Sequence, residues 1–325
     1  LLAHRPVGRV GGTAGVSGSW RAFSAVGVEA LTPPVDQSSL AAFVFEEAKW
    51  SRVSAQAGAR LETTRYRPAY GRPAREFADL SASAGAVWRV SEPLTLALSV
   101  ASASRRPALE ELYFDGLHIG NFAYEVGSAE LGSERALGVD ASLRWRWPRA
   151  SGEVTWFRNG IDGFIFREPT EATHKGFPVV HFVSRDSVLT GLEAKADVQV
   201  TSRVVAEVAV DTTRGRLASG EPLPRIPPLR ARFGARVQHL AWQSGAEVTV
   251  TARQARVYRG ESPTDGAATL RLFSSWSFGR GSTVQTVTLR LDNATAALHR
   301  NHLSYLKDAV AERGRSARVI YALGF

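Results

Sequence analysis

The sequence predicts an all-β protein whose strands form a transmembrane antiparallel β-barrel. Three observations predict this fold: apolar and polar residues alternate over long segments, these segments have about 10–14 residues, and short and long connections alternate along the chain. Residues 193–200 read Glu-Ala-Lys-Ala-Asp-Val-Gln-Val, so every second side chain is apolar. Because successive side chains of a strand point to opposite faces, such a segment has one apolar and one polar face. The same alternation runs through residues 139–147, 230–238 and 246–253.

Strand length and charged polar faces favour a membrane barrel over a soluble β-sandwich. Strands of ordinary sheets have about 5–6 residues, whereas a tilted strand needs about 9–11 residues to cross a bilayer. A sandwich hides its apolar faces in a core, but a membrane barrel turns them to lipid and keeps a polar interior. Charged residues such as Arg144 and Arg146, which alternate with Leu143 and Trp145, suit a water-filled lumen.

The connections between the expected strands are short at every second position. An outer-membrane barrel has this asymmetry, because its periplasmic turns are short and its extracellular loops are long. About 15 strands are expected by this pattern, and the weaker ones lie near residues 6–17, 19–30, 37–47, 51–65 and 79–89. Short connections are expected at residues 91–93, 148–150, 201–202, 241–243 and 279–282, and long ones at 105–134, 167–186, 213–227, 258–265 and 296–314.

The composition excludes several classes of protein. The 325 residues include no Cys, which excludes disulfides, thiolate metal sites and a Cys nucleophile. No run of about 18 apolar residues occurs, so no transmembrane helix is expected. The net charge is +9, but the Arg residues do not cluster and lack interleaved aromatic residues, so no nucleic-acid partner is expected. The chain has no Met and starts at Leu1, and an odd strand number is unusual for a bacterial barrel, so a fragment lacking N-terminal strands is expected.

Three sets of segments resemble one known family. Residues 104–113, Ser-Arg-Arg-Pro-Ala-Leu-Glu-Glu-Leu-Tyr, are similar to the family stretch SFRAPSLEELY, and residues 127–135 are similar to GNPNLKPERS. Residues 223–230 resemble a junction between an extracellular loop and a strand. The last set is residues 291–293, 300–308 and 314–315 together with the terminal Phe325. Together these segments resemble the C-terminal barrel of TonB-dependent outer-membrane receptors, although Ala294 and Thr295 stand where the family usually has Leu-Phe.

The resemblance implies a partial barrel domain over residues 1–325, the C-terminal 15 or so of 22 strands, with the N-terminal plug domain and TonB box absent. It implies the outer membrane of a Gram-negative bacterium and energy-coupled uptake of a scarce nutrient, such as an iron-siderophore, haem or zinc. The implied partners are the TonB–ExbB–ExbD complex through the missing plug, outer-membrane lipid and lipopolysaccharide, the barrel assembly machinery, and a small-molecule or metal-chelate ligand.

Two other classes of protein stay open at this point. A passive porin-like or plugless barrel would explain the alternation and the loop asymmetry, but not the resembling segments. A soluble β-sheet binding protein or adhesin would need its apolar faces to meet in a core. No enzyme activity, catalytic residue or cofactor is predicted, since the sequence lacks a phosphate loop, a Rossmann fingerprint and a nucleophile elbow.

Five histidines in the expected long loops are the candidate ligand-binding residues: His118, His174, His181, His299 and His302. Neutral imidazole is a common ligand for zinc, copper and nickel, and Gly116-Leu117-His118 resembles the GPH loop of zinc and haem receptors in the family. His118, His299 and His302 are therefore the candidate metal ligands, and the last two could share an ion only if their loop is helical. The alternative is that all five are ordinary polar loop residues that do not meet, because no pair has the spacing of a known metal motif.

Aromatic residues mark two further features. Phe325 ends the alternating series Val319, Tyr321, Leu323 and is the candidate signal for the assembly machinery, as the resemblance implies; the alternative is a plain lipid-facing residue. Interfacial aromatic girdles are expected, with Trp147 at the periplasmic rim. The candidate girdle residues are Trp145, Trp147, Trp156, Trp276 and Phe278.

Overall fold

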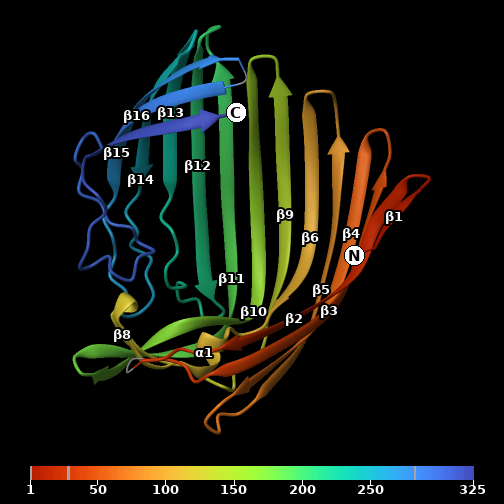
Figure 1. Ribbon diagram of the computed structural model, residues 1–325, viewed down its shortest axis with the longest axis vertical. Coiled ribbons are helices and arrows are strands. Elements are labelled where there is room, and N and C mark those ends of the chain that lie inside the picture. Colours follow the sequence, from red (N-terminus) through yellow and green to blue (C-terminus); the bar gives the residue numbers. More distant parts are fainter. Residues whose placement is uncertain (1, 28–29, 282) are drawn as a thin grey trace.

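The protein is built from one long β-sheet that curves into the wall of a barrel (Figure 1). The structure is a computed structural model that describes residues 2–27, 30–281 and 283–325. Seventeen strands belong to the sheet, of which β7 (Asp115–His118) and β8 (Ala123–Val126) are short strands within a connection. The other strands, called the wall strands here, agree in number with the sequence prediction. They are β1 (Leu2–Val7), β2 (Val10–Phe23), β3 (Val35–Lys49), β4 (Val53–Pro68), β5 (Arg75–Arg89), β6 (Leu94–Arg105), β9 (Glu134–Trp147), β10 (Ala150–His174), β11 (Phe177–Gln199), β12 (Val204–Leu217), β13 (Arg230–His239), β14 (Trp242–Thr251), β15 (Ala267–Arg280), β16 (Thr283–Asp292) and β17 (Ser316–Gly324).

Each wall strand pairs antiparallel with the next wall strand along the chain. The strands β3 and β4, for example, stay in register from Val35 opposite Pro68 to Lys49 opposite Ser54. Strand β6 pairs directly with β9, so the segment that holds β7 and β8 leaves the wall and returns to it. Within the described residues the sheet is open, because β1 pairs with β2 and β17 with β16, each along a single edge. The predicted fold class, an antiparallel β-barrel wall, is confirmed.

With one exception, the two-residue turn at Lys175-Gly176, the short connections lie at one end of the wall strands, and the long ones lie at the other end (Figure 1). Two-residue turns such as Gly8-Arg9 and Leu240-Ala241 close the short end. Gly8 has φ +63°, a conformation that glycine adopts without steric cost. The predicted asymmetry of the connections is therefore confirmed. The longest connections at the other end are residues 24–34, 106–133, 218–229, 252–266 and 293–315.

Two predicted boundaries are wrong. A break between strands is predicted near residue 18, but β2 runs through this position, and the turn lies at Gly8-Arg9 instead. The predicted long loop at 167–186 is a hairpin, in which β10 and β11 remain paired up to the turn at Lys175-Gly176. A strand that extends beyond the membrane has no lipid to face. It therefore lacks the alternation by which the sequence reveals strands.

The inner and outer faces of the wall differ in polarity. On the outer face, large apolar side chains such as Leu137, Phe233 and Val319 are exposed. On the inner face, charged side chains pair across strands, as Arg271 does with Asp292 at 2.8 Å. An exposed apolar surface that continues from strand to strand needs lipid or protein against it.

Several aromatic residues of the outer face gather near the short-turn end. Trp147 is the last residue of β9, and its ring centroid lies 6.1 Å from that of Trp145. Trp276 stacks on Trp242 at 5.7 Å and contacts Phe278 at 4.4 Å. Trp156 lies further along β10, toward the long connections. This distribution agrees with the girdle predicted at the rim of the short turns.

Two apolar clusters lie at the end of the long connections. The helix α1 (Leu109–Tyr113) contributes Leu109, Leu112 and Tyr113 to the first cluster, and a 3₁₀ turn, η1 (Ile119–Asn121), follows β7. The second cluster consists of Phe166, Leu217, Leu223, Ile226 and Tyr258. The long connections are therefore packed against the wall strands and against one another. In the part of the chain that the structure describes, no helix has the length and apolarity to cross a membrane.

Candidate ligand-binding site

Three connections cover a cavity at the long-connection end of the barrel. They are called loop A (residues 218–229), loop B (residues 252–266) and loop C (residues 293–315). The cavity measures about 870 Å³ and reaches from the inner faces of β10 to β15 to loop C. Its ionisable lining residues are Lys195, Arg230, Arg232, Arg300, Glu153, Glu193, Asp211, Asp265, Glu312, His299 and His302.

Lys307 fastens loop C to loop B. Its side chain is almost fully buried, with 1% of its surface exposed. The ammonium group donates to the carbonyl oxygen and to the hydroxyl oxygen of Ser262, both at 2.5 Å. The Ser262 hydroxyl also lies 2.5 Å from an oxygen of Asp308. A buried ammonium group requires such partners, because its desolvation is costly.

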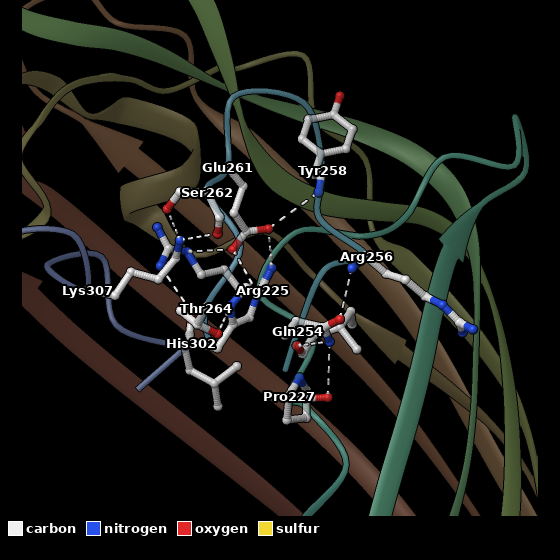
Figure 2. Close-up of polar contacts among 12 residues, drawn as sticks. Arg225, Pro227, Gln254, Arg256, Tyr258, Glu261, Ser262, Thr264, His302 and Lys307 are labelled. Carbon is white, nitrogen blue, oxygen red and sulfur yellow. Dashed lines mark hydrogen bonds and ion pairs between the residues drawn. The ribbon is translucent and has the colours of Figure 1, made fainter. Parts of the chain in front are cut away.

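His302 makes a second connection between the same two loops (Figure 2). Its imidazole is fully buried, and Nδ1 lies 3.0 Å from the hydroxyl oxygen of Thr264. The other ring nitrogen, Nε2, lies 3.3 Å from Oε1 of Glu261. This pair is close but misaligned, and neither atom has a hydrogen-bond partner among the described residues. Burial lowers the pKa of His302, as do the charges of Lys307 and Arg225, whereas the Glu261 carboxylate acts in the opposite direction.

Arg225 joins loop A to loops B and C. Its guanidinium group donates to the carbonyl oxygens of His302, at 3.4 Å, and of Ser304. Its backbone N–H donates to Oε2 of Glu261 at 3.3 Å (Figure 2). The residue has φ +58°, an unfavourable conformation for a side chain with a Cβ atom. Surrounding contacts must therefore hold the backbone of Arg225 in place.

The side chain of Gln254 links loop B to loop A. Its side-chain amide donates to the carbonyl oxygens of Ile226 at 2.9 Å and Pro227 at 3.4 Å (Figure 2). Its side-chain oxygen accepts a hydrogen bond from the backbone N–H of Arg256 at 3.0 Å. All the polar groups of this buried amide are thereby used within the two loops.

Tyr305 connects loop C to the β10–β11 hairpin. The guanidinium carbon of Arg167, on β10, lies 3.4 Å from the centroid of the Tyr305 ring, and that of Arg225 lies 3.9 Å from it. Both guanidinium groups therefore contact the same ring. Each contact is a cation–π interaction.

Arg167 extends this network to the segment that contains His118. It pairs with Glu125 of β8, whose side chain is 2% exposed. Oε1 of Glu125 also accepts from the amide nitrogen of Asn121 at 2.7 Å. His118 lies 3.3 Å from the same oxygen, and its Nδ1 is 2.7 Å from the Asn121 amide nitrogen. Arg167, Asn121 and His118 therefore meet at one buried carboxylate.

The structure distributes the five candidate histidines over different environments. His302 is buried between loops B and C, and His299 lines the cavity, with Nδ1 3.4 Å from the carbonyl oxygen of Ala297. His174 and His181 are exposed on the β10–β11 hairpin, whereas a long loop was predicted there from the sequence. His118 lies at the end of β7 and belongs to the Glu125 cluster.

The candidate metal ligands do not come together in one cluster. Among the described residues, no group of three or more His, Cys, Asp or Glu side chains is placed to hold a metal ion. Loop C forms no helix at residues 299–302, so the helical spacing that His299 and His302 would need is absent. The buried pair His302 and Glu261 lies beside two cations, Lys307 and Arg225, which disfavours a metal ion there. Metal binding by the three histidines remains a prediction.

The loop network itself could not be found by sequence analysis. Its key residues are Arg167, Arg225, Glu261, Tyr305 and Lys307, of which only Lys307, one of four lysines in the chain, is conspicuous by its type. Lys307 and Tyr305 fall within the resembling segment 300–308, and Arg225 falls within the segment 223–230. The resemblance therefore marked the positions of these residues without indicating their contacts.

The curved sheet, the asymmetric connections and the cavity beneath the loops define a barrel of the outer-membrane type. The sequence model of the family described as TonB dependent receptor-like, beta-barrel, matches residues 4–294. The chain belongs to this family, which is a family of outer-membrane receptors and transporters rather than of enzymes.

Several solved structures share the fold. The copper transporter OprC is 18% identical, with a TM-score of 0.80 over 89% of this chain and 48% of that chain. The FrpB iron transporter from Neisseria meningitidis is 13% identical, with a TM-score of 0.75 over 99% of this chain and 53% of that chain. The haemophore receptor HasR of Serratia marcescens, solved with its haemophore HasA and haem, is 14% identical, with a TM-score of 0.68 over 97% of this chain and 58% of that chain. This chain therefore spans about half the length of the solved chains it matches, and at these identities the likeness shows the fold.

Proposed function

We propose that this chain is the barrel part of a TonB-dependent receptor in the outer membrane of a Gram-negative bacterium, and that the receptor takes up a scarce nutrient. The observation that carries the proposal is the cavity of about 870 Å³ beneath loops A, B and C, at the end where extracellular loops belong. Its lining carries both signs of charge and two histidines, which suits a polar small molecule or a metal chelate. Proteins with the same fold include a copper transporter, an iron transporter and a haemophore receptor solved with haem, which supports this ligand class.

The proposed mechanism uses the loops for capture and the lumen for passage. A ligand enters between the loops and meets the inward-facing residues of β10 to β15, among them Arg230 and Arg232. A plug domain inside the barrel would report occupancy to the TonB–ExbB–ExbD complex, which draws on the proton gradient of the inner membrane. The exposed Phe325 at the end of the chain would be recognised by the barrel assembly machinery.

Uptake measurements in cells test this proposal. A strain that expresses the gene containing this chain is compared with its deletion strain for uptake of copper, iron-siderophore, zinc and haem. We expect uptake of one of them to need both the gene and an intact proton gradient. Uptake that survives collapse of the gradient would instead support a passive porin. A chain that stays soluble without detergent would support the soluble binding protein.

A pair of histidine variants tests the place of the ligand. His299→Ala alters the lining of the cavity and should weaken ligand binding at the cell surface. His239→Ala is the matched control, because His239 is exposed at the short-turn end of β13 and should have no effect. Equal loss of binding in both variants, or in neither, would argue against the cavity as the ligand site.

A further inference from the structure

The outer face of β9 to β12 changes from apolar to basic along its length. Nearest the short turns, this face carries only apolar side chains, such as Trp147, Leu143 and Val208. Toward the loops, the same alternation brings four exposed arginines to the outer face. Arg135 of β9 is opposite Asp162, whereas the other three form one group: Arg158 on β10, and Arg214 and Arg216 on β12.

The strand register brings these arginines close together. Arg158 is opposite Thr190 of β11, and Thr190 is in turn opposite Arg214, so the two arginines lie at one level with a small residue between them. Neighbouring strands are about 4.8 Å apart, so the two Cα atoms are about 10 Å apart. Arg216 follows two residues further along the same face of β12 and faces Val188. Three long side chains can therefore reach one group placed over Thr190.

These arginines have no anionic partner within the described part of the chain. Among the described residues none of them has an ion pair or a side-chain hydrogen bond, whereas Arg65, on the outer face of β4, pairs with Glu76 at 2.6 Å. Two carboxylates lie on the outer face nearby. Asp162 is opposite Arg135, and Asp186 accepts a hydrogen bond from the backbone N–H of Gly163 at 2.9 Å.

The position of the arginines corresponds to the outer boundary of the membrane. The strand is about 33 Å long from Val204 to Arg214. At a tilt of about 40° from the membrane normal, this length spans about 25 Å of membrane thickness. The apolar band of an outer-membrane barrel is also about 25 Å tall. The long side chain of Arg158, at the same level of the sheet as Arg214, extends its guanidinium group to the headgroups. Unpaired guanidinium groups there require an anion, and their planar fork matches phosphate.

We propose that Arg158, Arg214 and Arg216 form a binding site for the phosphate groups of a phosphorylated lipid in the outer leaflet. The acyl chains of this lipid lie against the apolar residues below the arginines, and its phosphates lie over Thr190. The site is on the outer face of the wall, and the cavity is on the inner face, so loss of one leaves the other intact. Nutrient uptake and lipid binding can therefore fail independently.

Lipid titration of the full chain in detergent, followed by native mass spectrometry, tests the proposal. The probe is diphosphoryl lipid A, compared with its fully dephosphorylated form and with inorganic phosphate. An arginine near an anionic lipid surface contributes about fivefold to affinity. Each single Arg→Gln variant should weaken binding about fivefold, and the triple variant about a hundredfold. The matched control is Arg65→Gln, which removes an arginine that already has a carboxylate partner and should change binding less than twofold.

Three results would overturn the proposal. The first is binding by the triple variant, or by the folded single variants if the triple does not fold, within twofold of the parent chain. The second is an equal loss for Arg65→Gln, which would indicate general charge attraction. The third concerns the phosphate groups. Equal binding of dephosphorylated lipid A would indicate a purely apolar site, and displacement of the lipid by inorganic phosphate at equal concentration would indicate a site for free anions.

Discussion

Replacement of Lys307 by Met should release loop C from loop B. The change removes two charge-assisted hydrogen bonds at 2.5 Å and leaves the carbonyl group of Ser262 without its donor. Hydrogen bonds of this kind contribute about 1.5–3 kcal/mol each, but the variant also avoids the cost of burying an ammonium group. A net loss of about 2–3 kcal/mol for closure of loop C is the balance that we expect. The open population should then rise roughly 30- to 150-fold.

Hydrogen exchange measures this opening directly. The backbone N–H groups of Ala309 and Val310 bond to the carbonyl oxygen of Leu306 at 3.0 and 2.7 Å, so they report on loop C. Their exchange should accelerate roughly 30- to 150-fold, and the amides of β14 should keep their exchange rates. Lys49→Met is the matched control, because Lys49 is an exposed lysine with a single ion pair to Glu47. Acceleration of less than threefold in loop C, or equal acceleration in β14, would refute the role of Lys307 as a loop fastener.

Three further changes have defined outcomes. Tyr305→Leu removes the ring that both Arg167 and Arg225 contact, so exchange in loop C should accelerate about tenfold, whereas Tyr305→Phe should stay near the parent rate. The pKa of His302 is lowered in the folded protein, so the unfolded chain binds more protons. The stability of loop C should therefore be complete above about pH 6.5 and fall as the pH decreases below it. Proteolysis of loop C should show this pH dependence, and His302→Gln should remove it. Gly127→Val should prevent folding of residues 106–133, because its Cβ would lie 2.7–2.8 Å from the backbone of α1; cleavage of that segment by protease at the parent rate would contradict this.

The wall strands could be predicted because their signal is local. A strand between lipid and lumen must alternate, so a segment such as 246–253 reveals its fold without knowledge of its neighbours. The signal fails where lipid is absent, as in the outer part of β10 and β11, which remain paired beyond the membrane. It also fails at Gly18, which looks like a turn residue but lies within β2 on its outer face.

The candidate site was predicted less completely, because its contacts join residues far apart in the sequence. Lys307 and Ser262 are separated by 45 positions, and no spacing rule links them. The histidines were selected from the sequence only because they fall in expected loops. The structure shows that His302 is buried between loops B and C, whereas His299 lines the cavity. Which of two loop histidines is buried depends on how loops B and C pack, which is a tertiary property.

The pairing of β6 with β9 has a consequence for the order of folding. Most wall strands pair with a strand that follows after a turn or a loop, so hairpins can form early and locally. The ladder of β6 and β9 instead closes over residues 106–133. Closure of a loop of this length costs roughly 2 kcal/mol more in chain entropy than closure of a two-residue turn. The two parts of the wall that meet at this ladder should therefore form before they join.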